Sequence, residues 1–267
     1  MTEPARSLSP TVQAVIADFI PICRTLAGDQ PYAISVSGSL GKGTWDKRSD
    51  IDFRLYTRDP LPWTDVDPER WTDYFAALEA WKEKGVTIDG VWCRTVGEIE
   101  TLMSGWFEGQ INPVPLVWTI WGYHVLPDMH HQHVIEDPYG IIAGWKERLR
   151  VFPPRLKTAL LNRYLESLRY WRGDYHYAHK VERADVPFLA GMSAKLVHEM
   201  IQVLFALNET YYVGDGSNLS FVEKFKIAPP NFTARVQEIL YPPPPEPFRA
   251  QYTALCTLID EVLALAG

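Results

Sequence analysis

Residues 37–53 read SGSLGKGTWDKRSDIDF, a glycine-rich segment that ends in two aspartates and decides the fold of the chain. Apolar runs flank it at 33–36 and 53–56. If the second run is a strand, Asp50 and Asp52 emerge on one face and Ile51 on the other, because strand side chains alternate. Two such carboxylates repel each other and favour a bound Mg²⁺, while a glycine-rich turn offers backbone N–H groups to phosphates. The segment therefore predicts nucleotide chemistry.

The composition is that of an ordinary globular protein. The chain has 267 residues, of which 46% are hydrophobic and 22% charged, enough for one large domain or two modest ones. A net charge of −7 argues against a nucleic-acid partner and suits a cationic small-molecule acceptor. Scattered Cys23, Cys93 and Cys256 favour free thiols in a reducing compartment. With neither a signal core nor a run of about 18 apolar residues, we expect a cytoplasmic protein without a membrane partner.

The order of periodic segments predicts an α/β (α+β) first domain over residues 1–140. Helical periodicity covers 12–26, ending at Gly28, and 71–82, ending at Gly85. Strand-like runs lie at 33–36, 53–56 and 86–93, and a short helix and a short edge strand are expected within 97–107 and 133–138. The segment 116–126 fits strand or helix equally. Together these segments predict a mixed sheet with flanking helices.

A different pattern follows Gly140. Helical periodicity recurs in 156–168, 192–207 and 252–263, and no comparable strand-like run is present. The proline-rich stretch 242–247 is expected to be a stiff connector between helices. Residues 141–267 are therefore expected to form an all-helical domain that closes a substrate cleft.

Metal-assisted phosphoryl or nucleotidyl transfer asks for a third carboxylate beside the first pair. Asp89 is the candidate, because a strand at 86–93 next to the aspartate strand would bring it to the same edge. Asp50, Asp52 and Asp89 would then bind Mg²⁺. The alternative for Asp89 is that it begins a turn. The alternative for the glycine-rich segment is a polar turn capped by Ser39 and Asp50, with Asp52 exposed to solvent.

The Gly38-Ser39 pair, Gly43-Thr44 and Ser49-Asp50-Ile-Asp52 resemble the signature of the DNA polymerase β-like nucleotidyltransferase superfamily. Within it, the chain is most similar to small bacterial enzymes that adenylylate aminoglycosides or lincosamides. The resemblance implies that Gly38 and Ser39 hold a nucleoside triphosphate, that Asp50 and Asp52 bind Mg²⁺, and that Asp89 is a metal ligand or the general base. Lys42 and Ser49 complete the expected nucleotide-binding set.

The resemblance extends more weakly to 206–214, ALNETYYVG, which is similar to a Leu-Asn-x-x-Tyr-(Phe/Tyr)-Pro-Gly stretch of those relatives. Val213 replaces the proline, and the lysine that often follows is missing from 214–218. Lys180, Lys195 and Lys224 are the candidates to replace it.

Other features compete for a role. The histidines at 124, 130, 131 and 133 fit an exposed polar loop better than a zinc site. Trp45 is a candidate to stack on a base. Glu199, four residues after Lys195, is either half of a helix-surface ion pair or an alternative general base.

We expect a nucleotidyltransferase that moves AMP from ATP, with Mg²⁺, to a hydroxyl of a small molecule such as an aminoglycoside-like antibiotic. The alternatives are a toxin-type or regulatory enzyme that modifies proteins, and a silent nucleotide-binding or antitoxin-like partner. The expected partners are a nucleoside triphosphate and a small-molecule acceptor, with no nucleic acid, in a monomer or homodimer. The identities of the acceptor and of the nucleotide base stay open.

Overall fold

The computed structural model describes residues 8–62, 64, 66–110, 125–214, 218–241 and 247–266. The chain divides into two compact units, the first made of Met1–Ser104 and Val125–Val151, the second of Gly105–His124 and Phe152–Gly267. Each unit is described by itself. Residues 116–124 of the ambiguous segment and the prolines at 242–246 lie outside the described residues.

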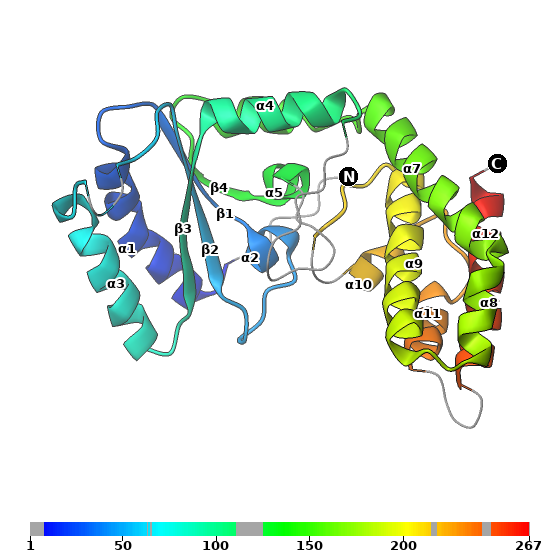
Figure 1. Ribbon diagram of the computed structural model, residues 1–267. Coiled ribbons are helices and arrows are strands. Elements are labelled where there is room, and N and C mark those ends of the chain that lie inside the picture. Colours follow the sequence, from blue (N-terminus) through cyan, green and yellow to red (C-terminus); the bar gives the residue numbers. More distant parts are fainter. Residues whose placement is uncertain are drawn as a thin grey trace. The chain divides into compact units, whose positions relative to one another are not determined.

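A mixed four-stranded sheet forms the centre of the first unit (Figure 1). Its strands are β1 (Tyr32–Val36), β2 (Ile51–Thr57), β3 (Ile88–Thr95) and β4 (His133–Glu136), in the order β3-β2-β1-β4. β1 is antiparallel to both β2 and β4, whereas β2 and β3 are parallel. The three central predictions, namely a mixed sheet, an aspartate strand and a short edge strand, are confirmed.

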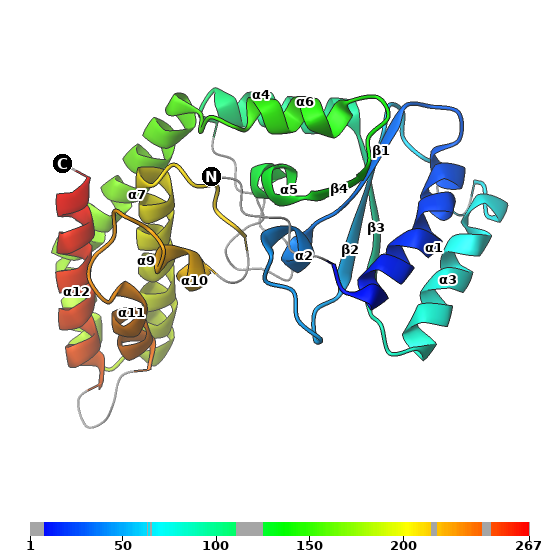
Figure 2. The same ribbon diagram turned by 180° about the vertical axis from the view of Figure 1, so that it is seen from behind.

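One face of the sheet packs against α1 (Pro10–Ala27) and α3 (Thr72–Glu83), which follows the 3₁₀ turn η1 (Glu69–Trp71). Figures 1 and 2 both show these helices on the same side of the strands. α1 begins where the Ser9 hydroxyl accepts a hydrogen bond from the Val12 N–H, at 3.3 Å, and ends at Gly28 with a φ of +64°. The Phe19 ring of α1 stacks on Phe53 of β2 at 4.8 Å, so the apolar face of β2 lies in this core.

The opposite face of the sheet packs against α5 (Val125–His131) and α6 (Ile141–Arg148). The buried Trp145 of α6 meets the Tyr56 ring of β2 edge-on, at 4.9 Å between ring centres. Its indole N–H donates to the Glu100 carboxylate of α4 (Val96–Phe107) at 2.6 Å. Because Trp145 is buried against the sheet, the first unit extends beyond residue 141, where we expected the boundary, to Val151.

Two segments differ from the expectation. Residues 38–42 form a short helix, α2 (Gly38–Lys42), instead of a turn. Residues 127–131, expected to lie in an exposed polar loop, belong to α5 (Val125–His131), in which Leu126 and Met129 are buried. The two helices support each other: a Cβ on Gly41 would lie 3.0 Å from the His131 carbonyl oxygen. Packing between segments far apart in sequence thus fixes both.

The second unit is all-helical in its described part, as predicted. Its helices are α7 (Pro154–Gly173), α8 (Tyr175–Glu182), α9 (Val186–Leu207), α10 (Asn218–Val222), α11 (Phe232–Leu240) and α12 (Pro247–Leu265). α9 is long and apolar enough to cross a membrane, but 67% of its 18-residue apolar window is buried inside the structure. Such burial is typical of a helix in a protein core.

Candidate active site

The three predicted carboxylates lie where β2 and β3 begin. Asp50 directly precedes β2, and Asp52 is its second residue. In the parallel pairing of β2 with β3, Ile51 lies opposite Ile88 and Asp52 opposite Gly90. Asp89 is therefore the extra residue of a β-bulge beside Asp52. Bulges often re-aim a side chain near an active site.

The carboxylates influence each other's ionisation. Burial raises the pKa of Asp52 to about 6, and the negative charges of Asp50, Asp128 and Asp89 add to this, while the Arg54 guanidinium opposes it. Partial burial and the charge of Asp50 also raise the pKa of Asp89. Within the residues that the structure describes, no group of three or more His, Cys, Asp or Glu side chains is arranged to hold a metal ion. Asp50, Asp52 and Asp89 thus carry negative charge that a divalent cation would neutralise. Their side chains are not arranged as a complete coordination shell.

Gly38 and Ser39 lie beside Asp52 at the start of α2. Gly38 has a φ of +56°, and a Cβ there would collide with the Asp52 carboxylate. The Ser39 hydroxyl oxygen is buried, and it meets no hydrogen-bond partner in the described part of the chain. A helix also leaves the N–H groups of its first turn without partners inside the helix. A space closed to a side chain therefore lies next to Asp52, and the residue that follows Gly38 carries an unpartnered hydroxyl.

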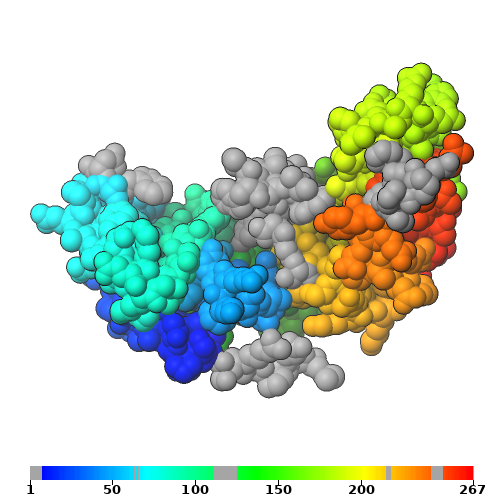
Figure 3. Space-filling model, turned by 90° about the horizontal axis from the view of Figure 1, so that it is seen from below, coloured from blue at the N-terminus to red at the C-terminus, as the bar shows by residue number. Residues whose placement is uncertain are grey.

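The structure gives Lys42 and Ser49 different surroundings. Lys42 ends α2 and helps to lower the pKa of His131, which burial brings to about 3. The Ser49 hydroxyl donates to the Asp46 carboxylate at 3.1 Å and accepts from the Asp46 N–H at 3.1 Å. Figure 3 shows the segment from α2 to Asp50 at the surface, coloured light blue. Ser49 thus stabilises the turn that leads into the aspartates.

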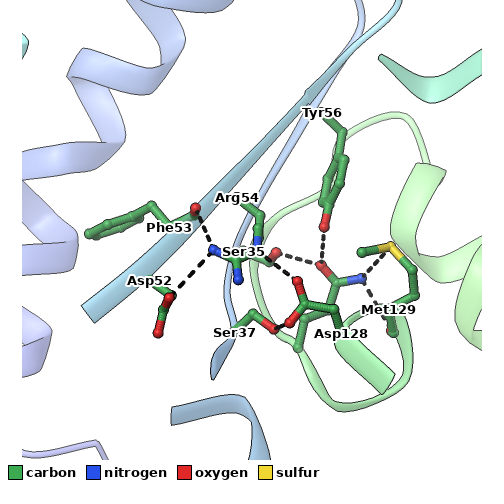
Figure 4. Close-up of polar contacts among 9 residues, drawn as sticks. Ser35, Ser37, Asp52, Phe53, Arg54, Tyr56, Asp128 and Met129 are labelled. Atoms are coloured by element: carbon green, nitrogen blue, oxygen red, sulfur yellow. Dashed lines mark hydrogen bonds and ion pairs between the residues drawn. The ribbon is translucent and has the colours of Figure 1, made fainter. Parts of the chain in front are cut away.

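Sequence reasoning missed two charged residues, Arg54 and Asp128 (Figure 4). Arg54 follows Asp52 on the same face of β2 and is 4% exposed. Its Nε donates to the Asp128 carboxylate at 2.7 Å, and its guanidinium pairs with Asp52 at 3.8 Å. Asp128 of α5, 6% exposed, also accepts a hydrogen bond from the Ser37 hydroxyl. The alternation of β2 was a signal for Arg54, whereas nothing local pointed to Asp128.

A second set of buried polar contacts anchors α5 to the sheet. The Gln132 side-chain oxygen accepts from the Ser35 hydroxyl at 2.5 Å and from the Tyr56 hydroxyl at 3.2 Å. Its amide donates to the Met129 carbonyl at 3.1 Å. These contacts fix the end of α5 against β1 and β2 (Figure 4).

The competing candidates have structural surroundings of their own. Trp45 packs against the core of the first unit. In the second unit, the Glu199 carboxylate is buried and accepts from Lys195 at 2.5 Å and from the Ser167 hydroxyl at 3.0 Å, while the Lys195 side chain is partly exposed. Lys180 pairs with Asp185 at 2.6 Å, and Lys224 lies over the Phe221 ring. His124 lies outside the described residues.

The chain matches two family models over consecutive, non-overlapping segments. Residues 16–104 match the nucleotidyltransferase domain, and residues 118–215 match a domain of unknown function (DUF4037). No curated protein matches the chain. Among solved structures, it is similar to a nucleotidyltransferase-like protein from Exiguobacterium sibiricum 255-15 at 10% identity, over 94% of this chain and 74% of that chain, with a TM-score of 0.47.

The mixed four-stranded sheet with flanking helices, followed by a helical region, is consistent with a nucleotidyltransferase fold. Residues 16–104 thus match the nucleotidyltransferase domain, a family of the DNA polymerase β-like superfamily. The match includes the Gly38-Ser39 pair and all three carboxylates. This domain supports a nucleotidyl transfer activity.

Proposed function

We propose that the protein transfers AMP from ATP to a hydroxyl of a small molecule, with Mg²⁺ held by Asp50, Asp52 and Asp89. The observation that carries the proposal is the close approach of Gly38 to the Asp52 carboxylate, with the unpartnered hydroxyl of Ser39 on the next residue. The acidic net charge of −7 favours a cationic acceptor such as an aminoglycoside-like antibiotic and disfavours nucleic acid. The proposal includes a cytoplasmic location, no membrane partner and a monomer or homodimer.

The residues of α2 would bind the triphosphate. The Ser39 hydroxyl and the N–H groups of the first helical turn are donors that a phosphate oxygen would satisfy. Lys42, at the other end of α2, would add a positive charge. Gly38 lets the phosphates approach the backbone, because a larger residue would displace the Asp52 side chain.

The carboxylates would supply the rest of the chemistry. A bound Mg²⁺ neutralises phosphate charge and aligns the oxygens for in-line displacement. Where Asp89 acts as the general base and not as a third metal ligand, it would take the proton of the acceptor hydroxyl, and its raised pKa brings it nearer to the working pH of such a base. The acceptor oxygen then forms a bond to the α-phosphorus, the bond from the α-phosphorus to the bridging oxygen breaks, and pyrophosphate leaves.

The test is an incubation of the protein with Mg²⁺ and each α-labelled nucleoside triphosphate, together with an aminoglycoside and lincosamide panel or with cell lysate. Labelled small molecule and released pyrophosphate are the expected products. The double variant Asp50→Asn with Asp52→Asn should lose at least about 1,000-fold in rate, because the metal ligands are gone. The matched control, Asp59→Asn with Asp73→Asn, removes the same charge from exposed positions and should keep full activity.

Each outcome has a distinct meaning. Label on protein, with none on small molecules, would show that the protein is a nucleotidyltransferase whose acceptor is another protein. Nucleotide binding without any transfer would show that the protein is a silent nucleotide-binding partner and not an enzyme. Full activity of the double variant would overturn the site. The general base is identified by comparing the kcat of Asp89→Asn with that of Glu199→Gln. We expect the larger loss of kcat in Asp89→Asn.

A further inference from the structure

We propose that Asp128 and Arg54 are positioning residues that tie the metal-binding carboxylate to the nucleotide-binding helix. The inference rests on the proposed function and deepens it. It adds to the site a helix, α5, that lies outside residues 16–104, the part that matches the nucleotidyltransferase domain.

Asp128 is a branch point between the two halves of the site (Figure 4). One of its oxygens accepts from the hydroxyl of Ser37, the residue directly before Gly38. The other accepts from Arg54 Nε at 2.7 Å. A single buried carboxylate therefore fixes both the start of α2 and the guanidinium beside Asp52.

Arg54 carries the connection from Asp128 to the carboxylate cluster. One of its NH groups donates to the Phe53 carbonyl at 3.1 Å, and its guanidinium lies over the Trp92 ring of β3 at 5.0 Å. These contacts, with Asp128, restrict the planar guanidinium to one orientation. In that orientation it lies 3.8 Å from the Asp52 carboxylate. Arg54 thus restricts the position of the carboxylate that is proposed to bind Mg²⁺.

The positions of these groups determine their role. Asp128 contacts Ser37 and Arg54, so we expect it to affect the reaction by positioning these two residues. Outer partners of metal ligands commonly change metal affinity about 10–100-fold when they are altered. A purely structural ion pair would change stability and leave the metal and nucleotide constants unchanged.

The experiment measures binding before activity. The dissociation constant of Mn²⁺ is measured by electron paramagnetic resonance with a non-hydrolysable ATP analogue, and that of the analogue alone is measured in EDTA. Asp128→Asn should raise the Mn²⁺ constant at least about tenfold and shift the Mg²⁺ concentration for half-maximal transfer by the same factor. At saturating Mg²⁺, its kcat should recover most of the wild-type value.

Two further variants separate the branches. Ser37→Ala leaves the Arg54–Asp128 pair and should raise the analogue constant in EDTA about threefold or more, with the Mn²⁺ constant unchanged. Arg54→Lys keeps the charge but loses the planar geometry, so it should reproduce the Mn²⁺ effect. The matched control is Glu136→Gln, which breaks another ion pair to arginine, with Arg24 Nε at 2.9 Å, and should change neither constant.

The outcomes are separable. If folded Asp128→Asn binds Mn²⁺ within twofold of the wild type, the inference is wrong while the proposed function stands. If Asp128→Asn does not fold, Arg54→Lys and Ser37→Ala decide by the same criteria. A wild-type protein that binds neither Mn²⁺ nor the analogue would overturn both the proposed function and the inference.

Discussion

The absence of a side chain at Gly38 determines both the backbone conformation there and the position of Asp52. Its φ of +56° is uncommon for any other residue, and the space where a Cβ would lie is filled by the Asp52 carboxylate. The residue that starts the helix is therefore in direct contact with the residue proposed to bind Mg²⁺. Backbone conformation and metal-site geometry cannot change independently here.

We expect Gly38→Ala to reduce transfer at least about 100-fold, because the new methyl group displaces Asp52, and to lower the free energy of unfolding by about 1–3 kcal/mol. The measurements are the transfer rate and the urea midpoint. Gly43→Ala is the matched control, with a φ of +70° but no atom within 4 Å of the added Cβ. Equal losses in the two variants would show that backbone strain, and not the collision with Asp52, is responsible.

The ionisation of Asp52 predicts a pH dependence of stability. Its folded-state pKa of about 6 is above the ordinary 3.8, so the protonated form stabilises the fold at low pH and this contribution is lost as the pH rises through about 6. In EDTA, Asp52→Asn should be more stable than the wild type by about 2 kcal/mol at pH 7 and equal to it near pH 4. Urea unfolding at several pH values measures the difference.

Asp46→Asn is the opposite case and serves as the control. Hydrogen bonds from the Arg48 N–H and the Ser49 hydroxyl lower the pKa of Asp46, so its charge stabilises the protein at neutral pH. That variant should be less stable than the wild type at pH 7. A loss of stability in Asp52→Asn at pH 7 would contradict the assignment of the raised pKa.

At the scale of elements, local pattern predicted well where burial is periodic. Strand alternation predicted Asp50 and Asp52 on one face and Ile51 on the other, and in β2 the side chains of Ile51, Phe53 and Leu55 lie in the core. The helical spacing of α1 and α7 also placed their buried residues correctly. In each case one face of the element packs against a continuous core, so the buried positions are visible as a regular spacing of apolar residues in the sequence.

Prediction failed where an element depends on contacts that are distant in sequence. α2 is rich in glycine, and its conformation is supported by α5, whose histidines and aspartate suggested a polar loop. Asp128 is 91 positions from Ser37 and 74 from Arg54, and neither spacing leaves a local pattern. The carboxylates Asp50, Asp52 and Asp89 were recognisable because a strand pairing brings them together; their buried partner was not.

For the whole molecule, two compact units predict two unfolding transitions. Trp145→Ala removes a buried ring from the first unit and should lower the stability of one transition by about 3–5 kcal/mol. Leu168→Ala, at a fully buried position of α7, is the matched change in the second unit and should lower the other transition by about 2–5 kcal/mol. Circular dichroism and fluorescence during urea titration distinguish the two. A single transition shifted by both variants would show that the units unfold together.

The path of the chain through these units limits how the protein can be recombined. The first unit is interrupted after Ser104 and resumes at Val125, so β4, α5 and α6 return to a sheet begun much earlier. A chimaera that exchanged only residues 16–104 would bring foreign strands to a resident α5, with Arg54 and Asp128 drawn from different ancestors. Natural exchange between relatives should therefore preserve these two residues as a pair, and gene-shuffling libraries should place their crossovers after Val151.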